Sequence, residues 1–210
     1  MKKKLVIFDM DGTLVDSSVT LVNAINHVRD KLSLEPMEEN EILSKLNDHT
    51  INPAKYFYEA DSFKADHEVW FSQYYKDNHK RELRLYKGIK ELLQELKERG
   101  FKLAVATNAY KVSTRQSLIY LDIIDYFDAI VCGDEVQWAK PYPDMLLKIL
   151  DKLNIKPQEA IFVGDGERDQ EAAKRANIDY IMVHWGFSKH KESDAVSTIE
   201  ELKKKILEYA

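Results

Sequence analysis

The sequence has very few of the residues that cross-link proteins outside the cytoplasm. Among 210 residues there is a single cysteine, Cys132, so no disulfide forms within the chain. Structural disulfides are typical of secreted proteins, whereas unpaired cysteines are common in reducing compartments. The scarcity of cysteine therefore predicts a cytoplasmic protein, in which Cys132, at the end of an apolar run, is an inert core thiol.

Long hydrophobic runs are missing as well. The first apolar stretch after the N-terminal lysines covers only residues 5–8 and ends at Asp9. Four residues are too few for a signal peptide and far too few to cross a bilayer. We therefore expect no membrane partner.

Positive charge is not concentrated in any part of the sequence. The chain has 31 lysines and arginines against 36 aspartates and glutamates, which gives a formal net charge of -5. Binding to a nucleic-acid backbone requires clustered basic residues, and the run 203–205 of three lysines is typical of the solvated face of a final helix. The sequence thus predicts no nucleic-acid partner, whereas a small anion needs only one local positive site.

Short apolar runs do occur, and they alternate with helical patterns. The runs are continuously apolar, as is typical of strands buried on both faces, and they cover residues 5–8, 103–106, 129–132, 161–163 and 180–183. Helical patterns between the later runs are followed by Gly100 and Asn177, which favour helix ends. A capping box from Ser197 to Glu200 opens a closing helix. Strands and helices in alternation predict an α/β protein with a Rossmann-like parallel sheet.

Residues 17–84 break this alternation, because they contain helical patterns without a convincing strand. Asn52 followed by Pro53 is typical of a helix N-cap and a first helical position. Large aromatic residues supply apolar faces for further helices: Tyr56, Phe57, Phe63, Trp70, Phe71 and Tyr74. We therefore predict a helical cap domain at 17–84, inserted into an α/β core domain formed by residues 1–16 and 85–210.

Polar residues follow the predicted strands at the points where the strands end. In an open parallel sheet the carboxyl ends of the strands meet at one edge, where ligands bind. The candidates are Asp9, Asp11 and Gly12 after the first strand, Thr107 and Asn108 after the second, Lys140 beyond the third, and Asp165 and Asp169 after the fourth. Carboxylates, a hydroxyl and an ammonium group at one edge indicate a catalytic site.

The carboxylates in this set predict a metal ion. Two carboxylates about 4 Å apart repel each other by roughly 4 kcal/mol at an effective dielectric constant of about 20, so a cation must offset their charge. The candidate ligands are all oxygen atoms, which favours Mg²⁺ over zinc. A Mg²⁺ ion held by few carboxylates commonly completes its shell with substrate phosphate, so the pattern indicates phosphoryl chemistry.

These residues resemble the motifs of the haloacid dehalogenase superfamily of phosphohydrolases, in the branch that carries a helical cap after the first motif. In order along the chain, Asp9-x-Asp11-Gly12-Thr13 is similar to the first motif, Thr107 to the second, Lys140 to the third, and Gly164-Asp165 with Asp169 to the fourth. As a whole the chain resembles phosphoglycolate-phosphatase-like members of that branch.

The resemblance implies a role for each candidate. Asp9 is the nucleophile that forms an aspartyl-phosphate, and Asp11 is the general acid and base. Mg²⁺ is held by the Asp9 carboxylate, the Asp11 backbone carbonyl and Asp165. The remaining roles are phosphate binding by Thr107 and the amides of Gly12 and Asn108, a countercharge from Lys140, and orientation of Lys140 or of a water on the ion by Asp169.

The implied function is that of a Mg²⁺-dependent phosphatase acting on a small phosphorylated metabolite. Two alternatives stay open, namely a sugar phosphate mutase similar to β-phosphoglucomutase and a non-catalytic module that binds a phospho-ligand. We expect the cap to act as a lid. Its best candidates for substrate contact are Lys45, Asn47 and His49, although solvated surface also fits them. We expect a monomer or a homodimer.

Overall fold

The computed structural model describes residues 2–46, 48, 50–187 and 194–209. Within these residues, five strands form a parallel sheet in the order β5-β4-β1-β6-β7. The strands are β1 (Leu5–Phe8), β4 (Lys102–Thr107), β5 (Ala129–Cys132), β6 (Ala160–Gly164) and β7 (Asp179–Met182). The predicted α/β class with a Rossmann-like parallel sheet is confirmed.

Helices cover both faces of the sheet, and β1 lies at its centre. Val6 and Phe8 pack into the core under α5 (Ile89–Glu98), α6 (Lys111–Tyr120) and α9 (Ile199–Leu207). Leu5 and Ile7 pack into the opposite core, under α7 (Asp144–Leu153) and α8 (Glu167–Ala176). Short 3-10 turns complete this part of the chain: η1 (Ile124–Tyr126), η2 (Gly133–Glu135) and η3 (Pro157–Glu159). Because both faces are covered, the strands are apolar throughout.

The helix ends follow the sequence signals closely. Gly100 has a φ of +84° just after α5, and Asn177 ends α8 in the left-handed conformation with a φ of +56°. The closing helix α9 differs slightly from expectation, because its N-cap is Thr198 rather than Ser197. The Thr198 hydroxyl accepts a hydrogen bond from the Glu201 backbone N–H at 3.2 Å. The predicted capping box from Ser197 to Glu200 is therefore wrong: the N-cap lies one residue later, and the Glu201 side chain accepts from the Ser197 backbone N–H at 2.7 Å.

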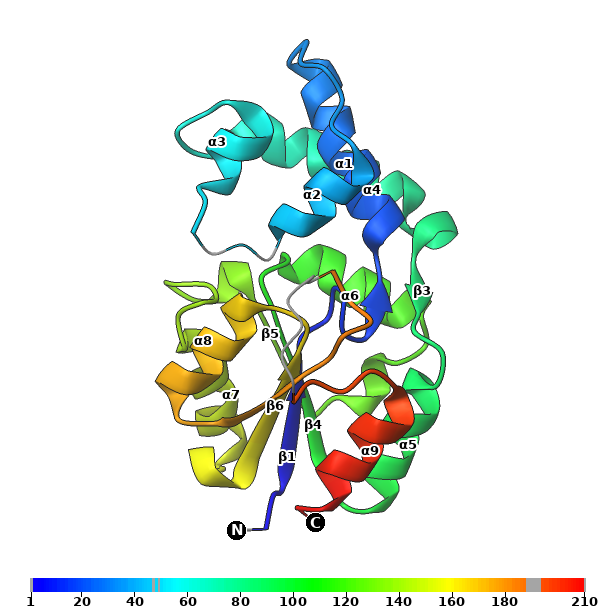
Figure 1. Cartoon of the computed structure of the whole chain (residues 1–210), viewed down its shortest axis with the longest axis vertical. Coiled ribbons are helices and arrows are strands. Elements are labelled where there is room, and N and C mark those ends of the chain that lie inside the picture. Colours follow the sequence, from blue (N-terminus) through cyan, green and yellow to red (C-terminus); the bar gives the residue numbers. More distant parts are fainter. Residues whose placement is uncertain (1, 47, 49, 188–193, 210) are drawn as a thin grey trace.

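The segment between β1 and α5 folds into four helices in its described part, and these lie beyond the carboxyl edge of the sheet (Figure 1). They are α1 (Ser18–Lys31), α2 (Glu39–Leu46), α3 (Pro53–Tyr58) and α4 (Ala65–Glu82). The helices share an apolar core of their own, which includes Val28, Ile42 and Phe57. Of the aromatic residues predicted to build this core, Phe63 is instead 48% exposed.

The start of α3 shows how the sequence dictates one of these helices. The side-chain Oδ1 of Asn52 accepts hydrogen bonds from the backbone N–H groups of Ala54 at 3.0 Å and Lys55 at 3.2 Å. Pro53 occupies the first helical position, where no intrahelical N–H is needed. The predicted N-cap at Asn52 is confirmed.

A short antiparallel ribbon joins the helical segment to the sheet. β2 (Val15–Asp16) pairs with β3 (Arg84–Leu85), with Asp16 opposite Arg84. The expectation that residues 17–84 contain no strand is therefore wrong at Arg84, because a two-residue pairing is too short to leave a periodic pattern in the sequence. The domain boundaries at 16/17 and 84/85 stay a prediction.

Cys132 ends β5 and is fully buried. Burial raises the pKa of its thiol to about 11. Because the thiolate is the reactive form of cysteine, this environment is that of an inert core thiol.

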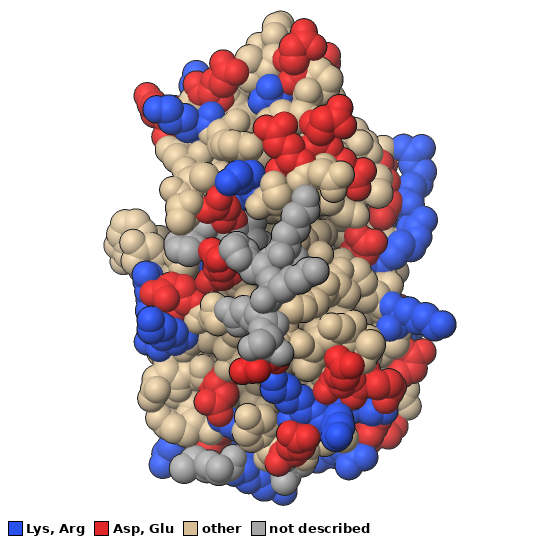
Figure 2. Space-filling model, viewed as in Figure 1, with Lys and Arg blue, Asp and Glu red and all other residues tan. Residues whose placement is uncertain are grey.

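Surface charge on the face drawn in Figure 2 is mixed, with acidic and basic side chains interspersed. The predicted lack of a nucleic-acid partner stays a prediction. In the described part of the chain, no helix combines the length and the apolar character needed to span a membrane.

Candidate active site

The carboxyl ends of β1 and β6 lie level at one edge of the sheet. Phe8, the last residue of β1, pairs with Val105 on β4 and with Val163 on β6. Asp9 therefore leaves β1 beside the point where Asp165 leaves β6. The parallel register brings together carboxylates that are more than 150 residues apart in the sequence.

Lys140 bridges two buried carboxylates at this edge. Its Nζ lies 2.5 Å from Oδ1 of Asp9 and 2.6 Å from Oδ1 of Asp169. Burial by itself lowers the pKa of Lys140, but the carboxylates of Asp169 and Asp9 outweigh it and hold that pKa above its usual value. Lys140 is therefore a charged group held in place by Asp169, which is one of the two roles suggested for Asp169 by the sequence.

Asp9, Asp165 and Asp169 form a cluster of buried carboxylates. One oxygen atom from each lies within 4.8 Å of the others. The pKa of Asp9 is raised well above its ordinary value by burial, and Asp169 and Asp165 add to the rise while Lys140 opposes it. One ammonium group does not balance three carboxylates, so this all-oxygen set fits a divalent cation of the Mg²⁺ type.

The carboxylate of Asp11 lies outside this cluster. The sequence motifs predicted that Asp11 contributes its backbone carbonyl, not its carboxylate, to the metal. The third carboxylate beside those of Asp9 and Asp165 belongs to Asp169. The Asp11 side chain instead accepts a hydrogen bond from the Ser17 hydroxyl at 2.6 Å. Burial raises the pKa of Asp11, with Ser17 opposing the rise. The environment thus favours the protonated form that a general acid needs.

The loop after β7 fixes Asp165, a role that the sequence did not reveal. The backbone N–H of Phe187 donates a hydrogen bond to Oδ2 of Asp165 at 2.6 Å. Gly186 lies so close to Asp165 and to the Gly12 carbonyl that a Cβ atom at position 186 would collide with both. A glycine in an ordinary loop gives no sign of such packing in one sequence.

Thr107 ends β4 and Asn108 follows it, and both line a cavity beside Asp9. The Thr107 hydroxyl accepts a hydrogen bond from the Ala109 N–H at 3.1 Å, and α6 begins only at Lys111, so Thr107 is not a helix cap. The Asn108 side chain accepts from the backbone N–H of Lys140 at 2.9 Å and donates to the Lys140 carbonyl at 3.0 Å. Asn108 therefore positions the lysine, in addition to the backbone-amide role predicted for it.

Gly12 serves the site by having no side chain. Its φ is +84°, and a Cβ atom there would run into the carboxylate of Asp165. Its backbone N–H donates to the Val15 carbonyl at 2.9 Å. The predicted contact between the Gly12 amide and a phosphate oxygen does not fit this hydrogen bond, because the donor is already used.

We expect Gly12→Ala to reduce turnover roughly 10- to 100-fold, because the new methyl group displaces the carboxylate of Asp165 and small misplacements at a reacting centre are costly. Gly100→Ala is the matched control, since Gly100 has the same φ of +84° but nothing within 4 Å of its Cβ position. Both variants pay about 1–2 kcal/mol for the left-handed backbone. Urea unfolding and steady-state kinetics measure the two effects, and equal turnover in both variants would contradict the steric role.

A cavity of about 130 Å³ opens beside the carboxylates and is lined by the sheet edge together with helices α1 and α2. Leu21 on α1 and Leu46 on α2 line it on the helical side. Arg168 on α8 and Phe187 line it from the core. None of these four was predicted to line the site, because their positions depend on how helices α1 and α2 and the loop after β7 pack at the sheet edge.

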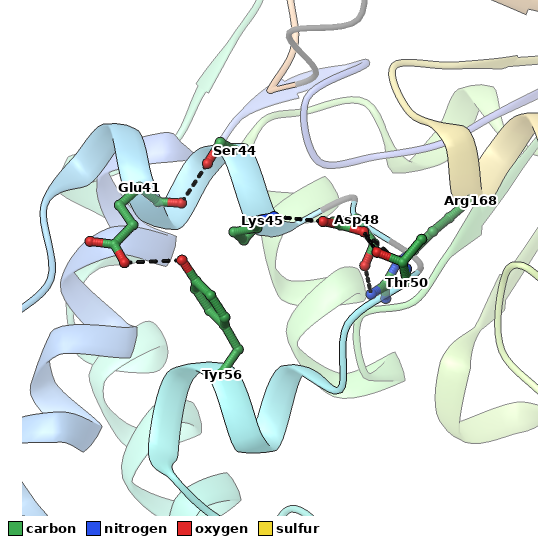
Figure 3. Close-up of polar contacts among 7 residues, drawn as sticks. All are labelled: Glu41, Ser44, Lys45, Asp48, Thr50, Tyr56 and Arg168. Atoms are coloured by element: carbon green, nitrogen blue, oxygen red, sulfur yellow. Dashed lines mark hydrogen bonds and ion pairs between the residues drawn. The ribbon is translucent and has the colours of Figure 1, made fainter.

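The predicted substrate contacts of the cap are only partly within the described residues. Lys45 forms an ion pair with Asp48 at 2.8 Å and does not line the cavity (Figure 3). Asn47 and His49 lie outside the described residues. Asp48 lies between α2 and α3, in a stretch that we call the cap loop after the predicted cap, and its backbone carbonyl accepts a hydrogen bond from Nη2 of Arg168 at 2.8 Å.

Comparison with known proteins gives a consistent set of similarities. Residues 6–183 match the family model of haloacid dehalogenase-like hydrolases. The chain is 32% identical over 186 residues to phosphoglycolate phosphatase of Aquifex aeolicus, covering 89% of this chain and 87% of that protein. It is 28% identical over 188 residues to pyrophosphatase PpaX of Bacillus cereus, covering 88% and 85%. The crystal structure of a predicted phosphatase from Clostridium acetobutylicum has a TM-score of 0.88 at 29% identity, covering 99% of this chain and 100% of that one.

Proposed function

Because the chain belongs to the haloacid dehalogenase-like hydrolase family, we propose that it is a Mg²⁺-dependent phosphatase that hydrolyses a small phosphorylated metabolite by way of Asp9. The observation that carries this proposal is the meeting of Asp9, Asp165 and Asp169 around the ammonium group of Lys140, beside a cavity. Such a group of charges has no structural purpose that an apolar core would not serve better.

Asp9 carries the first chemical step. A carboxylate oxygen of Asp9 forms a bond to phosphorus while the bond from phosphorus to the leaving oxygen breaks, and Asp11 gives its proton to that oxygen. Asp11, now ionised, accepts a proton from the water that attacks the aspartyl-phosphate. Inorganic phosphate leaves, and the carboxylate of Asp9 is restored. Lys140 orients Asp9 through its Oδ1 contact and opposes the negative charge of the cluster.

Mg²⁺ fits the carboxylate cluster by charge and by ligand chemistry. Asp9, Asp165 and the Asp11 carbonyl would hold it, with Asp169 close by. When bound, the ion supplies positive charge to the phosphoryl oxygens. Thr107 and the Asn108 backbone amide bind and orient those oxygens from the end of β4.

The small volume of the cavity favours a small substrate. Its volume of about 130 Å³ lies below the roughly 300 Å³ at which pockets for drug-sized ligands begin. Relatives are named for phosphoglycolate and pyrophosphate hydrolysis, and both are small molecules. These observations support a phosphate compound with few heavy atoms beyond the phosphoryl group.

A phosphate-release assay tests the proposal. We expect the purified protein to hydrolyse p-nitrophenyl phosphate in Mg²⁺, to lose at least about 100-fold in turnover when EDTA removes the ion, and to recover when Mg²⁺ is restored. Conversion of β-glucose 1-phosphate to the 6-phosphate without phosphate release would establish a mutase instead. Tight phosphate binding with no turnover of any ester would establish a binding module.

The setting of the enzyme is also part of the proposal. The single cysteine in the sequence supports a reducing compartment, and we place the protein in the cytoplasm. A monomeric or homodimeric state, without nucleic-acid or membrane partners, stays a prediction that size-exclusion chromatography with light scattering tests directly.

A further inference from the structure

Arg168 lies between the catalytic carboxylates and the cap. It occupies the first turn of α8, directly before Asp169, and lines the same cavity as Asp9 and Asp11. Figure 3 shows its side chain extending from the core to the cap loop, where Nη2 donates to the Asp48 carbonyl at 2.8 Å. The guanidinium group is thus held where a molecule in the cavity meets both parts of the protein.

Arg168 forms no ion pair with a carboxylate among the described residues, although the nearby charges of Asp169 and Asp48 favour its charged form. The carboxylate of Asp48 is used elsewhere, since it accepts from Lys45 at 2.8 Å and from the Thr50 backbone N–H and hydroxyl at 2.9 and 2.5 Å (Figure 3). Within the described part of the chain, Nε of Arg168 is buried without a hydrogen-bond partner. A buried charged donor without a partner is costly, so the site is suited to an anion that is not part of the protein.

Lys140, the other described cation that lines the cavity, is already neutralised. It holds Asp9 and Asp169 at 2.5 and 2.6 Å, and its backbone is fixed by Asn108. Among the described residues that line the cavity, Arg168 is therefore the cation whose donors remain for a second negative group on the substrate. The planar guanidinium also offers paired donors that match a carboxylate or a phosphate.

We propose that Arg168 binds a second anionic group on the leaving portion of the substrate and so selects the substrate class. The substrate is then a small phosphate compound whose leaving group carries its own carboxylate or phosphate. This inference rests on the proposed phosphatase function and adds a specificity-determining residue to it. The hydrogen bond to the Asp48 carbonyl positions the guanidinium group. An anion bound by Arg168 would therefore also lie beside the cap loop.

Pairs of substrates that differ only in the second anionic group measure the contribution of that group. Phosphoglycolate carries a carboxylate, and 2-hydroxyethyl phosphate has the same two-carbon frame with a neutral hydroxyl group instead. Inorganic pyrophosphate against methyl phosphate gives a second pair, in which the additional anion is a phosphate. The selectivity ratio, kcat/KM for the anionic member over kcat/KM for the neutral member, is the quantity to measure for each pair in Mg²⁺.

We expect Arg168→Gln to lower this ratio roughly 10- to 100-fold for at least one pair, because a hydrogen-bonded charge contact to the substrate is lost. The loss should fall mainly on KM, and Arg168→Lys should recover part of it. Arg175→Gln is the matched control on the same helix, since Arg175 is already paired with Glu171 at 2.8 Å and packs against Tyr142. The pair that responds identifies the anion as carboxylate or phosphate.

An equal loss of kcat/KM on anionic and neutral substrates would overturn the proposal and leave Arg168 as a structural link to the cap. An unchanged ratio would overturn it as well. Binding of phosphonoacetate, which is not hydrolysed, provides a readout besides turnover. Isothermal titration calorimetry in Mg²⁺ should show affinity reduced about 10-fold or more by Arg168→Gln but not by Arg175→Gln. If phosphonoacetate bound in an Arg168-dependent manner but the protein hydrolysed no ester, the proposed phosphatase function would be wrong. The assignment of Arg168 as an anion-binding residue would still hold.

Discussion

Asp9→Asn is expected to lower turnover of p-nitrophenyl phosphate at least about 1,000-fold, because loss of a nucleophile removes the covalent step. The amide is nearly the same size as the carboxylate, and its oxygen still accepts a hydrogen bond from Lys140, so the fold should be retained. Asp122→Asn is a suitable control, since it removes a carboxylate from the exposed pair with Lys90. Steady-state kinetics in Mg²⁺ and far-UV circular dichroism measure activity and folding.

Mass spectrometry gives an independent check on the same residue. Rapid quenching of the unmodified protein during turnover should trap a phosphoryl group on the peptide that contains Asp9, and Asp9→Asn should show none. Wild-type turnover in Asp9→Asn, with the same dependence on Mg²⁺, would exclude Asp9 as the nucleophile.

Lys140→Met is expected to destabilise the metal-free protein by about 3–5 kcal/mol, because it leaves the buried carboxylates of Asp9 and Asp169 without their cation. Urea unfolding in EDTA measures this loss. The loss should be smaller in saturating Mg²⁺, since a bound cation restores part of the missing charge. Turnover should fall roughly 100- to 1,000-fold with the loss of a preorganised positive group.

Two further variants test whether the stability loss in Lys140→Met comes from the unpaired buried carboxylates. Lys90→Met removes a lysine from an exposed ion pair with Asp122 and should change the free energy of unfolding by less than about 1 kcal/mol. Adding Asp169→Asn to Lys140→Met should restore part of the lost stability, because one uncompensated carboxylate is removed with it. A Lys140→Met protein as stable in EDTA as Lys90→Met would show that the bridge contributes nothing to stability.

The sheet was predictable because its strands are buried on both faces. Continuous apolar runs such as Leu5–Phe8 reflect packing against helices on either side, and Gly100 and Asn177 end their helices through a backbone preference that is local in sequence. The β2–β3 ribbon was missed because two paired residues leave no pattern. The shift of the α9 cap from Ser197 to Thr198 reflects two adjacent residues with similar capping ability.

The candidate site was also predictable in part, because the carboxyl ends of the strands of a parallel sheet converge at one edge. The strand order alone places Asp9 beside Asp165, whereas Lys140 lies in the loop beyond β5 and was assigned by its order among the family motifs. The contribution of Asn108 to Lys140 and the contact of Arg168 with Asp48 depend on the path of loops and on how the helices of residues 18–82 pack onto the sheet. Those features arise from long-range contacts, which neither periodicity nor residue spacing encodes.

The buried thiol at the end of β5 has a practical consequence for measuring motion. Only a thiolate attacks a maleimide reagent, and the Cys132 thiol is inaccessible with a pKa of about 11. Cysteines introduced at Val69 on α4 and Val112 on α6, which are 62% and 69% exposed, would take up fluorophores selectively without prior removal of Cys132. Energy transfer between the two dyes would then follow the distance between the helical segment and the sheet as phosphonoacetate is added.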